Sequence, residues 1–287
     1  TLTVVTGVSG SGKSSLVQQT LYPALCRALR QPGPPPPPCE IVGADLIDEV
    51  IQVDQSPIGR SSRSNPVTYL KAFDEIRKSF AATAEAKVRN FSASHFSFNS
   101  AQGGRCPKCK GSGVIEIDMQ FLPDVTMTCP DCHGTRFRRE ILNVKYRGRS
   151  IAEVLDMTAG EAFAFFRGKR KLQRQLKFLR DVGLDYLPLG QPANTLSGGE
   201  SQRLKLAAHL SAGAKSRSLF LLDEPTTGLH PADIVKLLDC FAALLDQGHS
   251  LIVVEHNLDV IRAADHLIDL GPDAGAVGGK VLATGTP

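Results

Sequence analysis

The sequence of 287 residues predicts an α/β fold with a phosphate-binding loop and an inserted segment that holds a metal ion. Three observations predict this fold. A strand, a glycine-rich loop and a helix open the chain, an apolar strand at 219–222 ends in two carboxylates, and four cysteines lie between them in two CxxC pairs. The apolar share of 42% supports a real core, and no run approaches the roughly 18 apolar residues of a membrane span.

The opening segment matches a loop that binds the phosphates of a nucleotide. After a strand at 1–6, residues 7–14 (GVSGSGKS) fit the pattern GxxxxGK[ST], and a helix is expected from Ser14 to Tyr22. Lys13 would reach the β and γ phosphates of ATP, and the Ser14 hydroxyl would bind Mg²⁺. A glycine-rich turn is the alternative, which the flanking strand and helix disfavour. The candidate ATP-binding residues here are Gly7, Ser9, Gly10, Ser11, Gly12, Lys13, Ser14 and Ser15.

The next stretch alternates loops with regular elements. Residues 31–39 (QPGPPPPPC) contain five successive prolines and are expected to form a stiff surface loop, with a ligand for a proline-binding module as the alternative. A strand is expected within 41–55, and it ends at Gln55, a candidate ligand for Mg²⁺ or for the attacking water. Residues 70–89 have the apolar spacing of one amphipathic helix that packs in the core.

Four cysteines predict a structural zinc site. Cys106 and Cys109 form one pair, nineteen residues follow, and Cys129 and Cys132 form the second pair. Four thiolates in a tetrahedron suit Zn²⁺ and leave no open coordination position, so the site should be structural. An iron–sulfur centre and a pair of disulfides are the alternatives. Cysteine use of this kind favours a reducing compartment, and we expect a cytoplasmic protein.

A basic segment surrounds and follows the cysteines. Residues 91–180 hold 16 Lys/Arg against 8 Asp/Glu, although the whole chain has a net charge of only +4. A hairpin is expected at 113–128, a pair of strands within 136–149 and a helix at 167–180. A solvated surface and contact with DNA phosphates are equally open interpretations. The candidate DNA contacts are Arg136, Arg138, Arg139, Arg170, Lys171 and Arg174.

The strand at 219–222 (LFLL) places two acids at its carboxyl end, where α/β proteins bind ligands. Asp223 could hold Mg²⁺, usually through water, and Glu224 is placed to polarise an attacking water. Before this strand, residues 196–200 (LSGGE) precede a helix expected to start near Gln202, and a helix N-terminus attracts phosphate. Alone, either feature could be a turn or a cap, but together they resemble the signature and Walker B motifs of the ATP-binding cassette ATPases.

The last stretch adds one more candidate. A helix is expected from Pro231 to the glycine at 248, then a buried strand at 250–254 that delivers Glu255 and His256. A histidine just past such a strand can contact the γ-phosphate through a neutral imidazole. A core or surface histidine is the alternative. Residues 267–285 are expected to form two strands joined by a glycine turn.

These motifs resemble those of the UvrA family, the damage-recognition ATPases of bacterial nucleotide excision repair, which belong to the ATP-binding cassette (ABC) ATPases. The resemblance runs nearly end to end, and its departures, the proline run and Ser61-Ser62, do not touch the ATP chemistry. It is carried by TGVSGSGKSSL at 6–16, VDQSPIGRSSRSNPVTY at 53–69, HFSFNSAQGGRC at 95–106, FLPDVTMTCPDC at 121–132, VGLDYLPLGQPANTLSGGESQRLKLA at 182–207, LLDEPTTGLHPADI at 221–234, VEHNLDVI at 254–261 and DLGPDAGAVGGKVLATGTP at 269–287.

The resemblance implies the second nucleotide-binding half of a UvrA-type protein. This is an ABC ATPase lobe with an inserted, mainly helical signature subdomain that carries a zinc ribbon, divided as 1–90, 91–195 and 196–287. It implies that Glu224, His256 and Gln55 act in catalysis, and that Asp223 and Ser14 bind Mg²⁺. Two such modules would pair head to tail, within a chain and in a homodimer. The residues that would complete the ATP site of a partner module are Ser197, Gly198, Gly199 and Glu200.

The resemblance also implies macromolecular partners. These are damaged duplex DNA and a UvrB-type helicase, the latter through a first half that is missing here. The chain opens directly on the phosphate-loop strand, so we expect an excised piece of a longer protein. An ABC transporter subunit or a UvrA-like drug-resistance protein is the alternative, although transport subunits generally have no CxxC pairs before the signature motif.

Overall fold

The structure is a computed structural model that describes residues 1–59, 61–117, 125–213 and 216–287. The chain divides into two compact units. Unit 1 comprises residues 1–56, 181–183 and 197–287, and unit 2 comprises residues 57–180 and 184–196. The sequence placed the first boundary at 90, whereas the contacts place it at 56. The reason is that Phe73 and Phe80 pack on Phe98 and Phe96, which lie farther along unit 2.

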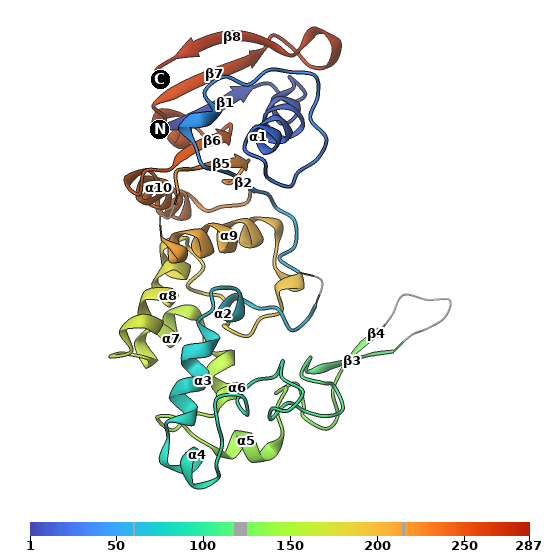
Figure 1. The fold of residues 1–287 in the computed structure, drawn as a ribbon, viewed down its shortest axis with the longest axis vertical. Coiled ribbons are helices and arrows are strands. Elements are labelled where there is room, and N and C mark those ends of the chain that lie inside the picture. Colours follow the sequence, from blue (N-terminus) through green and yellow to red (C-terminus); the bar gives the residue numbers. More distant parts are fainter. Residues whose placement is uncertain (60, 118–124, 214–215) are drawn as a thin grey trace. The chain divides into compact units, whose positions relative to one another are not determined.

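A six-stranded sheet forms the centre of unit 1 (Figure 1). All neighbouring strands are parallel except the last two, β7 and β8, which are antiparallel. Because parallel strands end on one edge, the loops after β1, β2, β5 and β6 meet there. In spatial order the strands are β2 (Glu49–Val53), β5 (Ser218–Asp223), β6 (Ser250–Val254), β1 (Leu2–Gly7), β7 (His266–Gly271) and β8 (Lys280–Gly285).

Helices cover both faces of this sheet. On one face, Leu219 and Leu221 pack with Val17 and Leu25 of a π-helix (η1, Ser15–Leu21) and the α-helix after it (α1, Tyr22–Ala28). Because side chains alternate along a strand, Phe220 points to the other face, where it contacts His209 of α9 (Gly198–Ala212). Two further helices of unit 1 are α10 (Pro231–Asp246) and α11 (Leu258–Arg262).

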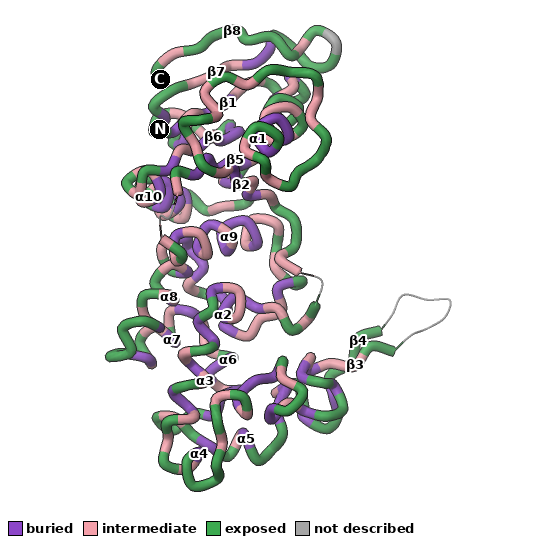
Figure 2. Tube along the Cα trace, in the orientation of Figure 1, coloured by how far each residue is buried: buried purple, intermediate pink, exposed green. Residues whose placement is uncertain are grey.

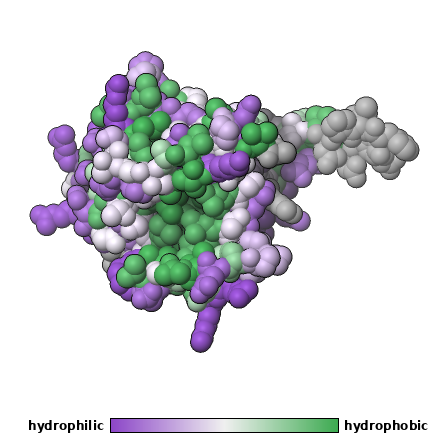
Figure 3. Space-filling model, turned by 90° about the horizontal axis from the view of Figure 1, so that it is seen from above, coloured by the Kyte–Doolittle hydropathy of each residue, from purple (hydrophilic) through white to green (hydrophobic). Residues whose placement is uncertain are grey.

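The edge strand β8 is the least covered part of the sheet. Figure 2 shows β8 as exposed along most of its length, whereas α9 consists mainly of buried and intermediate residues. Figure 3 looks onto this end of unit 1, and hydrophobic side chains gather in the middle of the face. Val281 and Leu282 of β8 are 58% and 53% exposed. Within the described residues, no helix is long and apolar enough to cross a membrane.

Unit 1 matches the expected elements with three differences. The helix expected from Ser14 to Tyr22 consists of η1 and α1 and continues to Ala28. The strand expected within 41–55 covers only Glu49–Val53, and a 3₁₀ turn at Ala44–Leu46 (η2) precedes it. The signature helix begins at Gly198 rather than near Gln202, because Ser197 and Glu200 form a capping box that starts the helix earlier. The strand at the start and the two strands of the tail are confirmed, and a 3₁₀ turn at Gly275–Val277 (η4) joins the latter.

Unit 2 is mainly helical, with one antiparallel hairpin. Its core is aromatic, since the rings of Phe80, Phe96, Phe98, Phe137 and Phe166 are fully buried. Its elements are α2 (Pro66–Tyr69), α3 (Phe73–Ala81), α4 (Ala84–Val88), β3 (Val114–Ile117), β4 (Val125–Thr128), α5 (Arg139–Asn143), α6 (Ile151–Asp156), α7 (Ala159–Phe165), α8 (Arg170–Asp181) and η3 (Ala193–Thr195).

Two expectations for unit 2 are wrong. The single helix expected over 70–89 is two helices, because the Thr83 hydroxyl accepts from the backbone N–H of Ala86 and caps a new helix. The pair of strands expected within 136–149 is absent from these described residues, which form α5 and an isolated bridge between Tyr146 and Arg149. The expected hairpin is confirmed by β3 and β4, but its Leu122-Pro123-Asp124 turn lies outside the described residues.

Candidate nucleotide site and metal centre

The loop after β1 encloses the ammonium group of its own lysine. Lys13 is 6% exposed, and its Nζ donates to the carbonyl oxygens of Gly7 and Val8 at 2.9 and 2.8 Å. Gly7 has φ +137°, and a Cβ there would lie 2.0 Å from the carbonyl oxygen of Leu270, so only glycine fits. The loop is thus shaped by its glycines around the point where Lys13 would meet phosphate.

A turn near the end of the chain donates backbone hydrogen bonds to this loop. The backbone N–H of Gly275 donates to the Gly10 carbonyl at 3.2 Å, and that of Gly279 donates to the Ser11 carbonyl at 3.0 Å. A glycine turn is predicted here from the sequence, but its contact with the phosphate loop is not. Such contacts join residues far apart in sequence, and no local pattern indicates them.

The carboxylate of Asp223 lies beside the helix that follows the loop. Its Oδ2 is 3.3 Å from the Ser14 hydroxyl and 2.5 Å from Nε2 of Gln18, a residue that the sequence analysis missed. Burial raises the pKa of Asp223 and the charge of Glu224 adds to this, while the bond from Ser14 and the charge of Lys13 oppose it. Neighbouring ligands of an octahedral Mg²⁺ lie about 3 Å apart, so the Ser14 and Asp223 oxygens fit one such ion.

Glu224 and His256 face each other across the ends of β5 and β6. The Glu224 carboxylate is 3.7 Å from Nε2 of His256, and both side chains are about half exposed. Glu224 has φ +42°, a left-handed backbone state that is uncommon for a non-glycine residue, and its N–H donates to the Val254 carbonyl at 2.9 Å. Strained residues of this kind concentrate at functional sites, which agrees with the role expected for Glu224.

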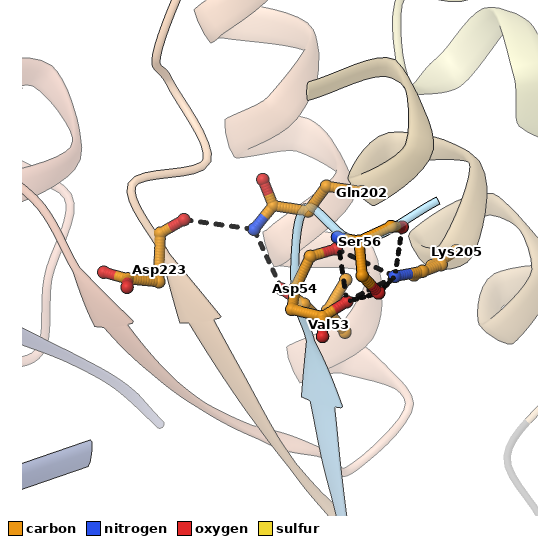
Figure 4. A network of polar contacts seen from close by, with 6 residues as sticks. All are labelled: Val53, Asp54, Ser56, Gln202, Lys205 and Asp223. Carbon is orange, nitrogen blue, oxygen red and sulfur yellow. Dashed lines mark hydrogen bonds and ion pairs between the residues drawn. The ribbon is translucent and has the colours of Figure 1, made fainter. Parts of the chain in front are cut away.

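The signature helix α9 is bonded to the ends of β2 and β5 (Figure 4). Nε2 of Gln202 donates to the carbonyl oxygens of Val53 and Asp223 at 2.9 and 3.2 Å. Nζ of Lys205 donates to the carbonyls of Asp54 and Ser56 at 3.0 and 2.9 Å, and it pairs with the Asp54 carboxylate. Burial opposes ionisation of Asp54, but the bonds from Lys205 and Ser56 lower its pKa overall. No sequence motif indicates this network.

Gln55, in the loop after β2, lies beside the first residue of the same helix. A Cβ placed on Gly198 would be 3.0 Å from both Cβ and Oε1 of Gln55, so the two residues are in close contact. The Ser197 hydroxyl accepts from the N–H of Glu200 at 3.2 Å, and the Glu200 carboxylate accepts from the N–H of Ser197 at 2.8 Å. The candidate partner-site residues, Ser197, Gly198, Gly199 and Glu200, therefore form the cap and first turn of α9.

The four cysteines of unit 2 are gathered into one buried cluster. Their sulfur atoms all lie within 4.8 Å of one another, with 3.9 Å between Cys106 and Cys129 and 3.6 Å between Cys109 and Cys132. A Zn²⁺ ion with four Zn–S bonds of 2.3 Å requires sulfur separations of about 3.8 Å, so the cluster fits zinc. This tetrathiolate site needs no further protein ligand.

One candidate DNA contact is not available at the surface. Arg136 is 9% exposed, its Nη2 donates to the Gly190 carbonyl at 2.9 Å, and its guanidinium lies 5.3 Å from the ring centre of Phe98. Burial lowers its pKa, against the opposing charges of Asp156 and the cysteines. Arg136 is therefore a core residue beside the cysteine cluster, and the hypothesis that it contacts DNA is wrong.

The other basic candidates are exposed. Arg138 and Arg139 stand at the start of α5, and Arg170, Lys171 and Arg174 lie on α8. Lys171 pairs with Glu75 at 2.9 Å, so part of its charge is compensated. A cleft of about 400 Å³ lies at the start of α8. It is lined by Glu75, Lys78, Ser79 and residues 168–172.

The phosphate loop, the acid pair, the histidine and the Ser-Gly-Gly helix start on one sheet define an ABC-type P-loop ATPase module. A family model described as "AAA domain, putative AbiEii toxin, Type IV TA system" matches residues 154–261. Over its whole length, however, the chain is similar to proteins of the UvrA type. It is 54% identical over 288 residues to UvrABC system protein A of Bacillus subtilis (strain 168), and 52% identical over 284 residues to that of Streptococcus pneumoniae serotype 4.

A solved structure shows the same similarity. The crystal structure of UvrA2 from Deinococcus radiodurans covers 99% of the chain with a TM-score of 0.89 and 48% sequence identity. The chain spans 30% of the length of the curated relatives it matches and 34% of the UvrA2 chain. The comparison therefore concerns one module of a longer kind of protein.

Proposed function

We propose that this chain is the ATP-hydrolysing module of a UvrA-type protein that recognises DNA damage in nucleotide excision repair. One observation carries the proposal. The phosphate loop, Asp223, Glu224 and His256 meet at the carboxyl edge of one sheet, in a chain 54% identical to UvrABC system protein A. Lys13 would hold the β and γ phosphates, Ser14 and Asp223 would hold Mg²⁺, and Glu224 would polarise the attacking water.

The active form would be a head-to-tail pair of modules. The first turn of α9 would present the N–H groups of Gly198 and Gly199 to the γ-phosphate held by the partner module, where the helix dipole favours negative charge. Gln55, which touches Gly198, would respond to that contact and act on the water or Mg²⁺. Because the chain carries one set of each motif, a single module should bind ATP but hydrolyse it slowly.

Turnover at different protein concentrations tests this proposal. We expect ATP turnover per chain to rise with concentration, and Glu224→Gln to lower kcat by about 100-fold or more while ATP binding is retained. Turnover per chain that is high and independent of concentration would contradict head-to-tail pairing. Unchanged turnover in Glu224→Gln would contradict the assignment of the site.

Unit 2 would carry the contact with DNA. Its exposed arginines on α5 and α8 suit phosphate contacts, and a detector of lesions has to read deformability rather than base edges. The zinc cluster would hold β3 and β4 in place, and a UvrB-type helicase would bind elsewhere in the full protein. A transporter subunit would have no need of these features.

Filter binding to damaged and undamaged duplex over a salt series tests the DNA role. Replacing both Arg170 and Arg174 by Ala should weaken binding to all sequences and lower the salt slope by about 2. Arg262→Ala, an exposed arginine of α11 in unit 1, is the matched control and should change neither quantity. Indifference of the unaltered protein to DNA at low salt would favour the transporter interpretation.

A further inference from the structure

We propose that Glu255 is a positioning residue for ATP hydrolysis, because its buried carboxylate holds the loop of Glu224 and the loop of His256 in one arrangement. The proposal rests on the function proposed above and adds a residue to it. Glu255 precedes the candidate histidine, but its role depends on a contact with Thr226, 29 residues away, which no local sequence pattern indicates.

Glu255 lies where the carboxyl ends of the parallel strands meet, directly after one of the central strands. It follows β6, which lies between β5 and β1, so its neighbours are the strand that ends in Asp223 and the strand that leads to the phosphate loop. Its N–H donates to the Val5 carbonyl at 3.1 Å, which continues the pairing with β1 by one residue. The residue is 2% exposed, although the two residues that it would position, Glu224 and His256, are exposed.

The two carboxylate oxygens serve different loops. Oε1 accepts from the backbone N–H of Thr226 at 2.8 Å, in the turn after β5. Oε2 accepts from the N–H groups of His256 and Asn257 at 2.8 and 3.0 Å, in the turn after β6. Among the described residues, Glu255 forms no ion pair with a basic side chain, so three backbone N–H groups stabilise its charge.

The turn after β5 is short, so fixing Thr226 also fixes Glu224. The N–H of Thr227 donates to the Glu224 carbonyl at 3.2 Å, and the Thr227 hydroxyl lies 3.4 Å from the Glu224 carboxylate. This turn holds Glu224 at its positive φ, and the opposite turn holds His256 with its Nε2 3.7 Å from the Glu224 carboxylate. Glu255 therefore connects the two groups without touching the reacting atoms.

Glu255→Gln in the complete protein tests this role. An amide has one acceptor oxygen, and its NH₂ group cannot accept from the N–H groups of the second loop, so one of the two loops is released. We expect kcat to fall by about 10-fold or more, with KM and ATP affinity within about 2-fold, because the phosphate loop is untouched. Glu255→Asp keeps both acceptor oxygens on a shorter side chain and should restore part of the lost kcat.

Glu49→Gln is the matched control. Glu49 is the first residue of β2, so it lies at the end of the strand away from the candidate site. Its Oε1 accepts from the hydroxyls of Ser216 and Ser218, both at 2.7 Å. The same chemical change there should lower thermal stability and leave kcat as it is. It separates a loss of sheet stability from a loss of positioning.

Three results would overturn the role of Glu255. They are a wild-type kcat in Glu255→Gln, a parallel loss of ATP affinity and kcat, and a kcat in Glu255→Asp as low as in Glu255→Gln despite normal folding. Glu224→Gln, measured beside them, keeps the two proposals apart. If Glu224→Gln is inactive while Glu255→Gln is normal, only the positioning role fails, and if Glu224→Gln is active, the proposed function fails.

Discussion

Two glycines that hold equivalent places after the cysteine pairs differ in their surroundings. Gly111 and Gly134 have φ values of +88° and +84°, and each follows a residue that is also left-handed, Lys110 or His133. A Cβ on Gly111 would lie 1.9 Å from the carbonyl oxygen of Phe98, whereas a Cβ on Gly134 would meet only Thr128 Cγ2, at 3.7 Å. The turn after Cys109 is thus packed against the core of unit 2, whereas the turn after Cys132 has open space around its glycine.

We therefore predict different outcomes for two identical substitutions. Gly134→Ala should cost only the strain of a left-handed alanine, about 1–2 kcal/mol. Gly111→Ala adds a clash with backbone that cannot move away, so it should lower the zinc content of the purified protein and the melting temperature much further. Zinc analysis and thermal unfolding of both variants measure this. Equal losses in the two would contradict the described packing of Gly111.

At the scale of the element, α9 depends on one lysine for its attachment to the loop after β2. The Lys205 side chain is 15% exposed, and its ammonium has acceptors on both Asp54 and Ser56. Lys205→Met removes the donor to the Asp54 and Ser56 carbonyls and the cation beside the Asp54 carboxylate, so we expect unit 1 to lose about 1.5–3 kcal/mol of unfolding free energy. Urea unfolding followed by circular dichroism gives this value.

A second lysine provides the comparison for this prediction. Lys236 of α10 pairs with Asp233 at 3.2 Å within the same helix, and its side chain is 41% exposed. Lys236→Met should change the unfolding free energy by no more than about 0.5 kcal/mol, because exposed pairs of this type contribute little. A loss in Lys205→Met as small as in Lys236→Met would show that the α9 network does not stabilise unit 1.

Elements with a strong local signal were predictable from the sequence. The phosphate loop and the strand at 219–222 depend on contiguous residues, and the hairpin between the cysteine pairs follows from alternation. The break at Thr83 was missed because the apolar spacing continues across it, so two helices share one pattern. The helix at Arg139–Asn143 was missed because basic side chains say little about backbone conformation.

The site was predictable where a motif carries the chemistry and unpredictable where tertiary contacts do. Lys13, Asp223 and the cysteine cluster follow from spacing. Gln202 and Lys205 reach residues about 150 positions away, and Glu255 reaches Thr226 only because β5 and β6 are neighbours in the sheet. Burial of Arg136 likewise depends on its contacts with Phe98 and Gly190, which charge counting cannot show.

At the scale of the whole molecule, the candidate zinc site and the candidate nucleotide site lie on separate stretches of the chain. The cysteine cluster lies in unit 2, and the phosphate loop and acid pair lie in unit 1. Removal of zinc by a chelator should speed amide hydrogen exchange over residues 100–140, since four thiolates lose their shared ion, while ATP binding persists. Hydrogen exchange and titration with a fluorescent ATP analogue measure the two effects. Simultaneous loss of both would contradict the division into units.

The contact between Gln55 and Gly198 affects how freely the length of the segment between them can vary. The main chain leaves unit 1 after Ser56 and returns at Ser197. The residues of unit 1 that flank this inserted segment, Gln55 and Gly198, are in contact with each other. Apart from residues 181–183, which belong to unit 1, the inserted segment forms unit 2. Doubling the length of a flexible segment whose ends are held together costs only about 0.6 kcal/mol in closure entropy. A change in the length of this inserted segment is therefore compatible with an unchanged fold of unit 1.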